Sequence, residues 1–188
     1  IAIVLGKSVF GFSATPDSAW VDSVYRSLTV EQRIAQLLII RAYSCRDTAY
    51  ADSLCGIIAK FNPGGVCFFK GSPVNQAALT NRFQRSAQTP LLVSMDAEWG
   101  LGMRLDSAFS FPRQMALGAV SDDSLIYRMG RMIAKNCRRM GIQVNFAPVA
   151  DINNNPKNPV IGFRSFGEDR QKVAAKCIMY MKGLQDEA

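Results

Sequence analysis

Two carboxylates, a tryptophan and an arginine follow a short apolar run near the middle of the chain. Residues 90–105 read PLLVSMDAEWGLGMRL, so Asp96 and Glu98 come directly after an aliphatic stretch, with Trp99 and Arg104 close behind. Carboxylates accept hydrogen bonds from hydroxyl groups, a guanidinium donates several, and an aromatic ring covers an apolar face, which together suit the binding of a sugar. Asp and Gly after a strand are also ordinary turn chemistry, so Asp96 as a cap of the turn remains an alternative.

No metal or cofactor is expected from the residue types present. The chain has no histidine, and its five cysteines form no C-x-x-C pair, so the common zinc spacings are missing. Gly6-Lys7-Ser8 matches the end of a phosphate-binding P-loop, but the first glycine of that motif would fall on Ile1. We therefore set aside a nucleotide-binding function.

The positive charge of the chain is spread along its length. There are 22 Lys and Arg against 15 Asp and Glu, a formal charge of +7. The densest basic group recurs at helical spacing opposite apolar residues, as on the solvated face of a helix, and consists of Arg128, Arg131, Lys135 and Arg138. We expect no nucleic-acid partner. A phosphosugar-handling α/β protein is the function that charge alone would favour, but a glycine-rich phosphate loop is missing.

The elements that must position these residues alternate between strand and helix. Expected strands are 38–42, 66–69, 91–95 and 143–148, and expected helices begin after Thr29 and cover 50–61, 72–87, 122–140 and the residues from 170 onward. This alternation, without hairpin signals, predicts a parallel α/β sheet. Asp96 then lies at the carboxyl end of its strand, the end that carries the active site in barrels of strands and helices.

Both ends of the chain give expectations about its context. Residues 1–14 are apolar and end in Ser13 and Ala14, which predicts a signal-peptide remnant and export to the periplasm or beyond, with a disordered or structural leader as the alternative. Residues 15–27 are expected to be a linker, and 28–188 the folded domain. No apolar run reaches the roughly 20 residues of a membrane span. The chain stops after a helical pattern with no closing strand, so we expect a fragment.

Five motifs in order resemble glycoside hydrolase family 3, in its branch similar to β-N-acetylhexosaminidases. They are PGGV at 63–66, PLLVSMDAEWG at 90–100, FP at 111–112, NFAPVADIN at 145–153 and NPVIGFRSFG at 158–167. The resemblance covers nearly everything from Leu28 onward. It implies the N-terminal portion of a (β/α)8 TIM-type barrel with about four βα units, which hydrolyses β-linked sugars with retention of configuration.

The resemblance also implies roles for particular residues. Asp96 matches an aspartate that accepts hydrogen bonds from sugar hydroxyls, Arg104 matches the second arginine of the family's D-x-E-G-G-R-x-x-R pattern, and Arg164 matches an arginine that holds sugar hydroxyls. The alternative for Arg164 is a loop clamp that binds a carboxylate such as Asp151 or Glu168. Trp99 stands where the family commonly has glycine, and Leu101 where it has arginine, so this loop departs from the usual form.

The family's catalytic groups have no match in the sequence. In this branch a histidine in a K-H-F-P-G-H-G loop serves as acid/base and an aspartate on a later loop as nucleophile, and the chain contains no histidine. No catalytic residue is therefore assigned. We expect the sugar-binding half of a β-N-acetylhexosaminidase site, with a carbohydrate substrate and the missing C-terminal half of the barrel as partners. A β-glucosidase of the same family and a non-catalytic carbohydrate-binding module are the alternatives.

Overall fold

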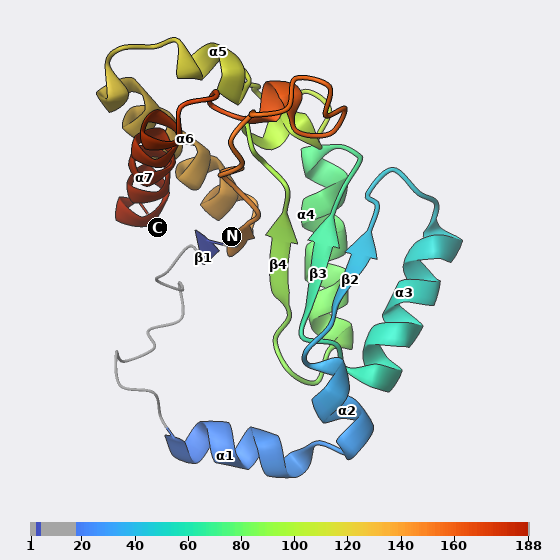
Figure 1. Ribbon diagram of the computed structural model, residues 1–188. Coiled ribbons are helices and arrows are strands. Elements are labelled where there is room, and N and C mark those ends of the chain that lie inside the picture. The colour runs from blue at the N-terminus through green and yellow to red at the C-terminus, as the bar shows by residue number, and fades with distance from the viewer. Residues whose placement is uncertain (1–2, 5–17, 188) are drawn as a thin grey trace.

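Strands and helices alternate along the chain in the computed structural model, which describes residues 3–4 and 18–187 (Figure 1). Apart from Ile3–Val4, the expected leader at residues 1–14 lies outside the described residues. Helix α1 (Ser18–Ser27) occupies most of the stretch that we expected to be a linker. No helix in the described part of the chain is long and apolar enough to cross a membrane.

The sheet is built from parallel strands that lie side by side in chain order. They are β2 (Ile39–Ala42), β3 (Gly65–Phe68), β4 (Leu92–Met95) and β5 (Val144–Asn145). Each pairs with the next in parallel, and the short β1 (Ile3–Val4) runs antiparallel along the outer side of β5. Parallel neighbours joined through helices are successive βα units, so the predicted parallel sheet is confirmed.

Helices connect the strands and cover the sheet. They are α2 (Val30–Ala35), α3 (Thr48–Phe61), α4 (Pro73–Ser86), the short α5 (Gln114–Gly118), α6 (Asp123–Arg139) and α7 (Arg170–Asp186). Two 3₁₀ turns, η1 (Leu101–Met103) and η2 (Gly162–Arg164), lie within the loops after β4 and β5. In Figure 1 both turns sit above the carboxyl ends of the strands, whereas α1 and α2 lie at the opposite end.

Side-chain caps fix where several of these helices begin. Thr29 accepts from the backbone of Gln32, whose side chain in turn accepts from the Thr29 backbone, a reciprocal capping box. Asp47, Ser72 and Asp169 cap α3, α4 and α7, each with its side chain accepting from a backbone amide of the first turn. These caps explain why the predicted helix starts fall within two residues of the observed ones.

Two expectations differ from the structure, one about the length of a strand and one about the buried face of a helix. Strand β5 covers only Val144–Asn145 of the expected 143–148, and Pro148 has no backbone amide with which to extend the ladder. The apolar spacing in α7 predicts a buried face of Val173, Cys177, Met181 and Leu184. The observed buried face contains Lys176, Tyr180 and Gly183 besides Val173 and Leu184, and Cys177 and Met181 are only partly buried. The apolar spacing alone did not reveal that a lysine and a tyrosine would turn inward.

Helices α6 and α7 approach each other through glycines. A Cβ built on Gly183 would lie 2.1 Å from the carbonyl oxygen of Tyr127, and one on Gly130 would lie 2.5 Å from that of Tyr180. No side chain fits at such separations. This close crossing brings the buried Tyr180 from α7 to the underside of the loop that follows β4.

Candidate functional site

The candidate site lies along the carboxyl ends of the parallel strands, where the loops after β2, β3, β4 and β5 come together (Figure 1). Each loop contributes residues: Tyr43 after β2, Phe69 after β3, Asp96 to Arg104 after β4, and Arg164 from the long loop after β5. The strands of a parallel sheet all have their carboxyl ends on the same side, so residues far apart in the chain meet in the loops there.

Asp96 forms an ion pair with Arg104 within the loop after β4. The Nη2 of Arg104 lies 2.6 Å from Oδ2 of Asp96, and its Nε lies 3.3 Å from the Asp96 carbonyl oxygen. The side chains of Arg104 and Asp96 are 22% and 29% exposed. Oδ1 of Asp96 accepts no hydrogen bond within the described part of the chain, so one carboxylate oxygen is left for a ligand. Two of the three residues that we expected to bind sugar, Asp96 and Arg104, are thus brought together.

Arg164 meets Glu98, a pairing that the sequence reasoning missed. Its Nε lies 3.0 and 3.1 Å from the two carboxylate oxygens, and its Nη2 lies 2.7 Å from Oε1. The Glu98 side chain is 2% exposed, and the hydrogen bond to it raises the pKa of Arg164. A fork of this kind supports the clamp alternative for Arg164, with Glu98 in place of the expected Asp151 or Glu168.

Buried polar side chains hold the backbone between Asp96 and Glu98. Asn145 accepts from the Ala97 amide at 2.9 Å and donates to the Ala97 carbonyl at 3.3 Å. Gln114 and Tyr180 each donate to the Glu98 carbonyl at 3.0 Å. Burial raises the pKa of Tyr180 well above its ordinary value, so its hydroxyl keeps the proton that it donates. The loop is therefore anchored from β5, α5 and α7, which fixes the direction of Asp96.

A row of aromatic rings and guanidinium groups continues from Arg104 toward β2. Arg104 stacks over Phe69 at 4.8 Å, and Phe69 lies 5.8 Å from Tyr43 between ring centroids. The ring of Tyr43 is in turn approached by Arg41 at 5.2 Å and Arg46 at 5.8 Å. Rings and planar cations packed in this way support one another and keep Arg104 turned toward Asp96.

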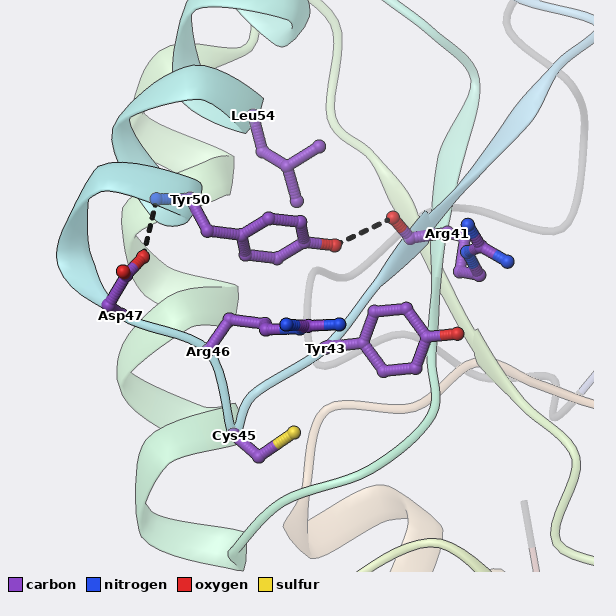
Figure 2. A pocket seen from close by; sticks show the side chains of 7 residues that line it. All are labelled: Arg41, Tyr43, Cys45, Arg46, Asp47, Tyr50 and Leu54. Atoms are coloured by element: carbon purple, nitrogen blue, oxygen red, sulfur yellow. Dashed lines mark hydrogen bonds between the residues drawn. The ribbon is translucent and has the colours of Figure 1, made fainter.

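The row ends in a hollow of about 650 Å³ between β2 and α3 (Figure 2). Figure 2 shows the Tyr50 hydroxyl directed at the carbonyl of Arg41, a contact of 3.4 Å, and Asp47 capping the helix. Arg41 and Arg46, which line this hollow, have no carboxylate partner within the described residues. This hollow is open and positively charged, and it belongs to the outer end of the site.

In the described part of the chain, the other titratable groups offer no metal site and no activated nucleophile. No cluster of His, Cys, Asp or Glu among the described residues could hold a metal ion. All five cysteines are free, and burial raises the pKa of Cys137 to about 12. Both carboxylates of the site, Asp96 and Glu98, are bound to guanidinium groups. The arrangement is suited to accepting and donating hydrogen bonds to a polar ligand rather than to transferring protons.

Comparison with known proteins identifies a family that matches most of the chain. Residues 29–188 match the family described as Glycosyl hydrolase family 3 N terminal domain. The chain is 29% identical over 175 residues to a beta-N-acetylglucosaminidase/beta-glucosidase of Cellulomonas fimi, an alignment that covers 93% of this chain and 30% of the relative. It is 31% identical over 194 residues to beta-hexosaminidase A of Pseudoalteromonas piscicida, and this alignment covers 89% of this chain and 32% of that relative.

A solved structure agrees with these relatives. The glycoside hydrolase family 3 beta-N-acetylglucosaminidase from Paenibacillus sp. str. FPU-7 is 35% identical and superposes with a TM-score of 0.74, over 85% of this chain and 31% of that one. The chain thus spans about a third of the length of these three proteins. The expected partial TIM-type barrel is confirmed, and the match over residues 29–188 shows that the chain belongs to glycoside hydrolase family 3, as part of its N-terminal barrel domain.

Proposed function

We propose that this chain supplies the sugar-binding half of the active site of a retaining β-N-acetylhexosaminidase that removes terminal β-linked N-acetylglucosamine. The observation that carries the proposal is the Asp96–Arg104 pair at the carboxyl end of β4, with one carboxylate oxygen free. A carboxylate fixed by a guanidinium is a strong acceptor for a sugar hydroxyl. The relatives named for hexosaminidase or N-acetylglucosaminidase activity support the choice of sugar.

In this proposal the chain binds the sugar, and groups that the chain lacks cleave the glycosidic bond. A retaining glycosidase needs an acid/base and a nucleophile about 5–5.5 Å apart across the scissile bond. Asp96 and Glu98 each hold an arginine, and the chain has no histidine. We therefore place both reacting groups in the C-terminal half of the barrel, which this chain does not contain. Export of the complete protein is part of the proposal and rests on the apolar residues 1–14.

A β-glucosidase is the second candidate. The relative from Cellulomonas fimi carries both activities in its name, which supports glucose as the second candidate sugar for this chain. The two sugars differ at the 2-position, where one carries an acetamido group and the other a hydroxyl. A comparison of aryl β-N-acetylglucosaminide with aryl β-glucoside as substrates of the complete protein separates the two activities.

The decisive experiment measures hydrolysis by the longest reading frame that contains these residues, beside the 188-residue chain alone. The long protein should release the aryl group from the N-acetylglucosaminide, and the short chain should not. Asp96→Asn in the long protein should lower kcat/KM by about tenfold or more, the equivalent of a lost charged hydrogen bond of ~1.5–3 kcal/mol.

The matched control is Asp106→Asn, at an exposed aspartate ten residues further along. It should leave kcat/KM unchanged. A long protein that binds N-acetylglucosamine but cleaves neither substrate would instead favour the non-catalytic carbohydrate-binding module.

A further inference from the structure

The backbone between Asp96 and Glu98 joins the two ion pairs of the candidate site. Asp96 binds Arg104 and Glu98 binds Arg164, so the direction of both carboxylates depends on how this short stretch of backbone is held. Ala97 is fully buried and Glu98 is 1% exposed, whereas the side chain of Asp96 is 29% exposed. The backbone is therefore held in the interior, and only the Asp96 side chain reaches the surface.

Tyr180 reaches this backbone from α7. Its hydroxyl oxygen lies 3.0 Å from the Glu98 carbonyl oxygen and 3.3 Å from that of Ala97. The residue has no exposed surface, and burial raises its pKa well above the ordinary value, so the hydroxyl remains a donor. Because Tyr180 is fully buried, it does not touch a ligand. Any effect that it has on a ligand must pass through the backbone between Asp96 and Glu98.

Gln114 from α5 is a second donor to the same carbonyl group. Its Nε2 lies 3.0 Å from the Glu98 carbonyl oxygen, so Gln114 and Tyr180 together use both lone pairs of that oxygen. The Oε1 of Gln114 is buried and accepts no hydrogen bond within the described part of the chain. A buried acceptor without a partner is destabilising, so a native structure that keeps one calls for an explanation. A methionine of similar size would avoid this cost, and stability alone therefore does not account for the glutamine.

We propose that Tyr180 and Gln114 are positioning residues for sugar binding. Their donors hold the Glu98 carbonyl group and so set the angle at which the Asp96 carboxylate meets a sugar hydroxyl. A hydrogen bond weakens steeply when donor and acceptor are misaligned, so a small rotation of this backbone lowers the affinity. The inference rests on the proposed function, because it assumes that Asp96 holds the sugar. Both positioning residues lie outside the five motifs that carry the family resemblance.

The test measures how tightly methyl β-N-acetylglucosaminide binds to variants of the 188-residue chain, in titrations followed by NMR. Tyr180→Phe keeps the ring and removes the donor, and Gln114→Met keeps the size of the side chain and removes the amide. Each should weaken binding about tenfold, which corresponds to about 1.4 kcal/mol. The matched control is Tyr127→Phe, which removes a hydroxyl that donates to Asp186 beside the same helix crossing. It should leave the affinity unchanged.

A double-mutant cycle shows whether the two positioning residues act through Asp96. In an Asp96→Asn background, Tyr180→Phe and Gln114→Met should each change the affinity by less than about twofold, because the charged acceptor that they orient is gone. An equal loss of affinity with and without the Asp96 carboxylate would mean that the two residues act by another route, and it would overturn the proposal.

Urea denaturation of the same variants separates positioning from a purely structural role. Gln114→Met removes the unpaired acceptor together with the donor, so its free energy of unfolding should stay close to that of the wild type while its affinity for the sugar falls. A loss of affinity that merely follows the loss of stability across Tyr180→Phe, Gln114→Met and Tyr127→Phe would show a structural role only and would also overturn the proposal.

The outcomes also separate this inference from the proposed function. If Asp96→Asn weakens binding while Tyr180→Phe and Gln114→Met bind as the wild type does, the positioning role fails and the proposed role of Asp96 stands. If Asp96→Asn binds as the wild type does, the proposed role of Asp96 fails, and the positioning role fails with it. A wild-type chain that does not bind the sugar would overturn both.

Discussion

Glu98 carries a charge in the interior of the loop after β4, and its counter-charge comes from a residue 66 positions later. The pair is asymmetric, since the side chain of Glu98 is 2% exposed and that of Arg164 is 36% exposed. A buried carboxylate without its cation is far less stable than a partly exposed guanidinium without its anion. The two ends of the pair should therefore respond differently to substitution.

Arg164→Ala should destabilise the fold more than Glu98→Ala, because it leaves the buried carboxylate unpaired. We expect a loss of about 3 kcal/mol in the free energy of unfolding for Arg164→Ala, at the lower end of the range for broken buried pairs. Urea denaturation with an unchanged m-value measures it. The control is Asp52→Ala, which breaks the exposed pair with Arg82 and should cost about 1 kcal/mol or less. Equal losses for the three variants would contradict the asymmetry.

Cys137 predicts a pH dependence of stability. Burial raises its pKa from 9.0 to about 12 in the folded chain, so above pH 9 the unfolded chain loses the thiol proton while the folded chain keeps it. The stabilising effect is complete below pH 9 and is lost as the pH rises toward 12, with a slope of at most about 1.4 kcal/mol per pH unit. Unfolding of the wild type between pH 8 and 10.5 should therefore show a steeper decline than that of Cys137→Ala. Parallel curves would contradict the prediction.

At the scale of elements, the α6–α7 crossing depends on Gly183. Gly183→Ala must move the helices apart, because the new methyl would collide with the backbone of Tyr127, and we expect a loss of about 1–3 kcal/mol. Gly56→Ala is the matched control, since a Cβ there meets nothing within 4 Å and α3 should gain slightly in stability. Thermal unfolding of both variants tests the difference. Because Tyr180 lies at this crossing, Gly183→Ala should also weaken sugar binding, whereas Gly56→Ala should not.

The sequence predicted most elements because their signals are local. The helix start after Thr29 and the apolar runs of β3 and β4 depend only on neighbouring residues, and the structure confirms them. The pairing of Arg164 with Glu98 was missed because spacing along the chain says nothing about which carboxylate a loop arginine will reach. The inward turn of Lys176 was missed for the same reason, since its partners are the Val120 carbonyl and Asp123.

The whole molecule has two unlike sheet edges. Within the described residues, β5 is flanked by β1, whereas the outer side of β2 has no strand beside it. Apolar side chains around β2 are exposed, with Leu37 at 85%, Leu38 at 55% and Ile39 at 44%. An open edge with exposed apolar groups invites pairing with another chain.

The isolated 188-residue chain should therefore associate through β2. Ile39→Lys places a charge on this edge and should shift the chain toward monomer, whereas Val74→Lys, on the exposed face of α4, should not. Sedimentation velocity over a range of concentrations compares the two variants. A wild-type chain that stays monomeric at high concentration would contradict the role of the open edge.

The order of the strands also bears on how the chain folds during synthesis. Because β2 to β5 lie side by side in chain order, each βα unit can dock on the one before it as it leaves the ribosome. The ion pair between Glu98 and Arg164 cannot form unit by unit in this way, because Glu98 is synthesised 66 residues before Arg164. The delay is about 3–13 s at roughly 5–20 residues per second. Until then the Glu98 carboxylate must stay hydrated. The loop that holds Asp96 therefore reaches its final form only after β5 and the long loop that follows it have been translated.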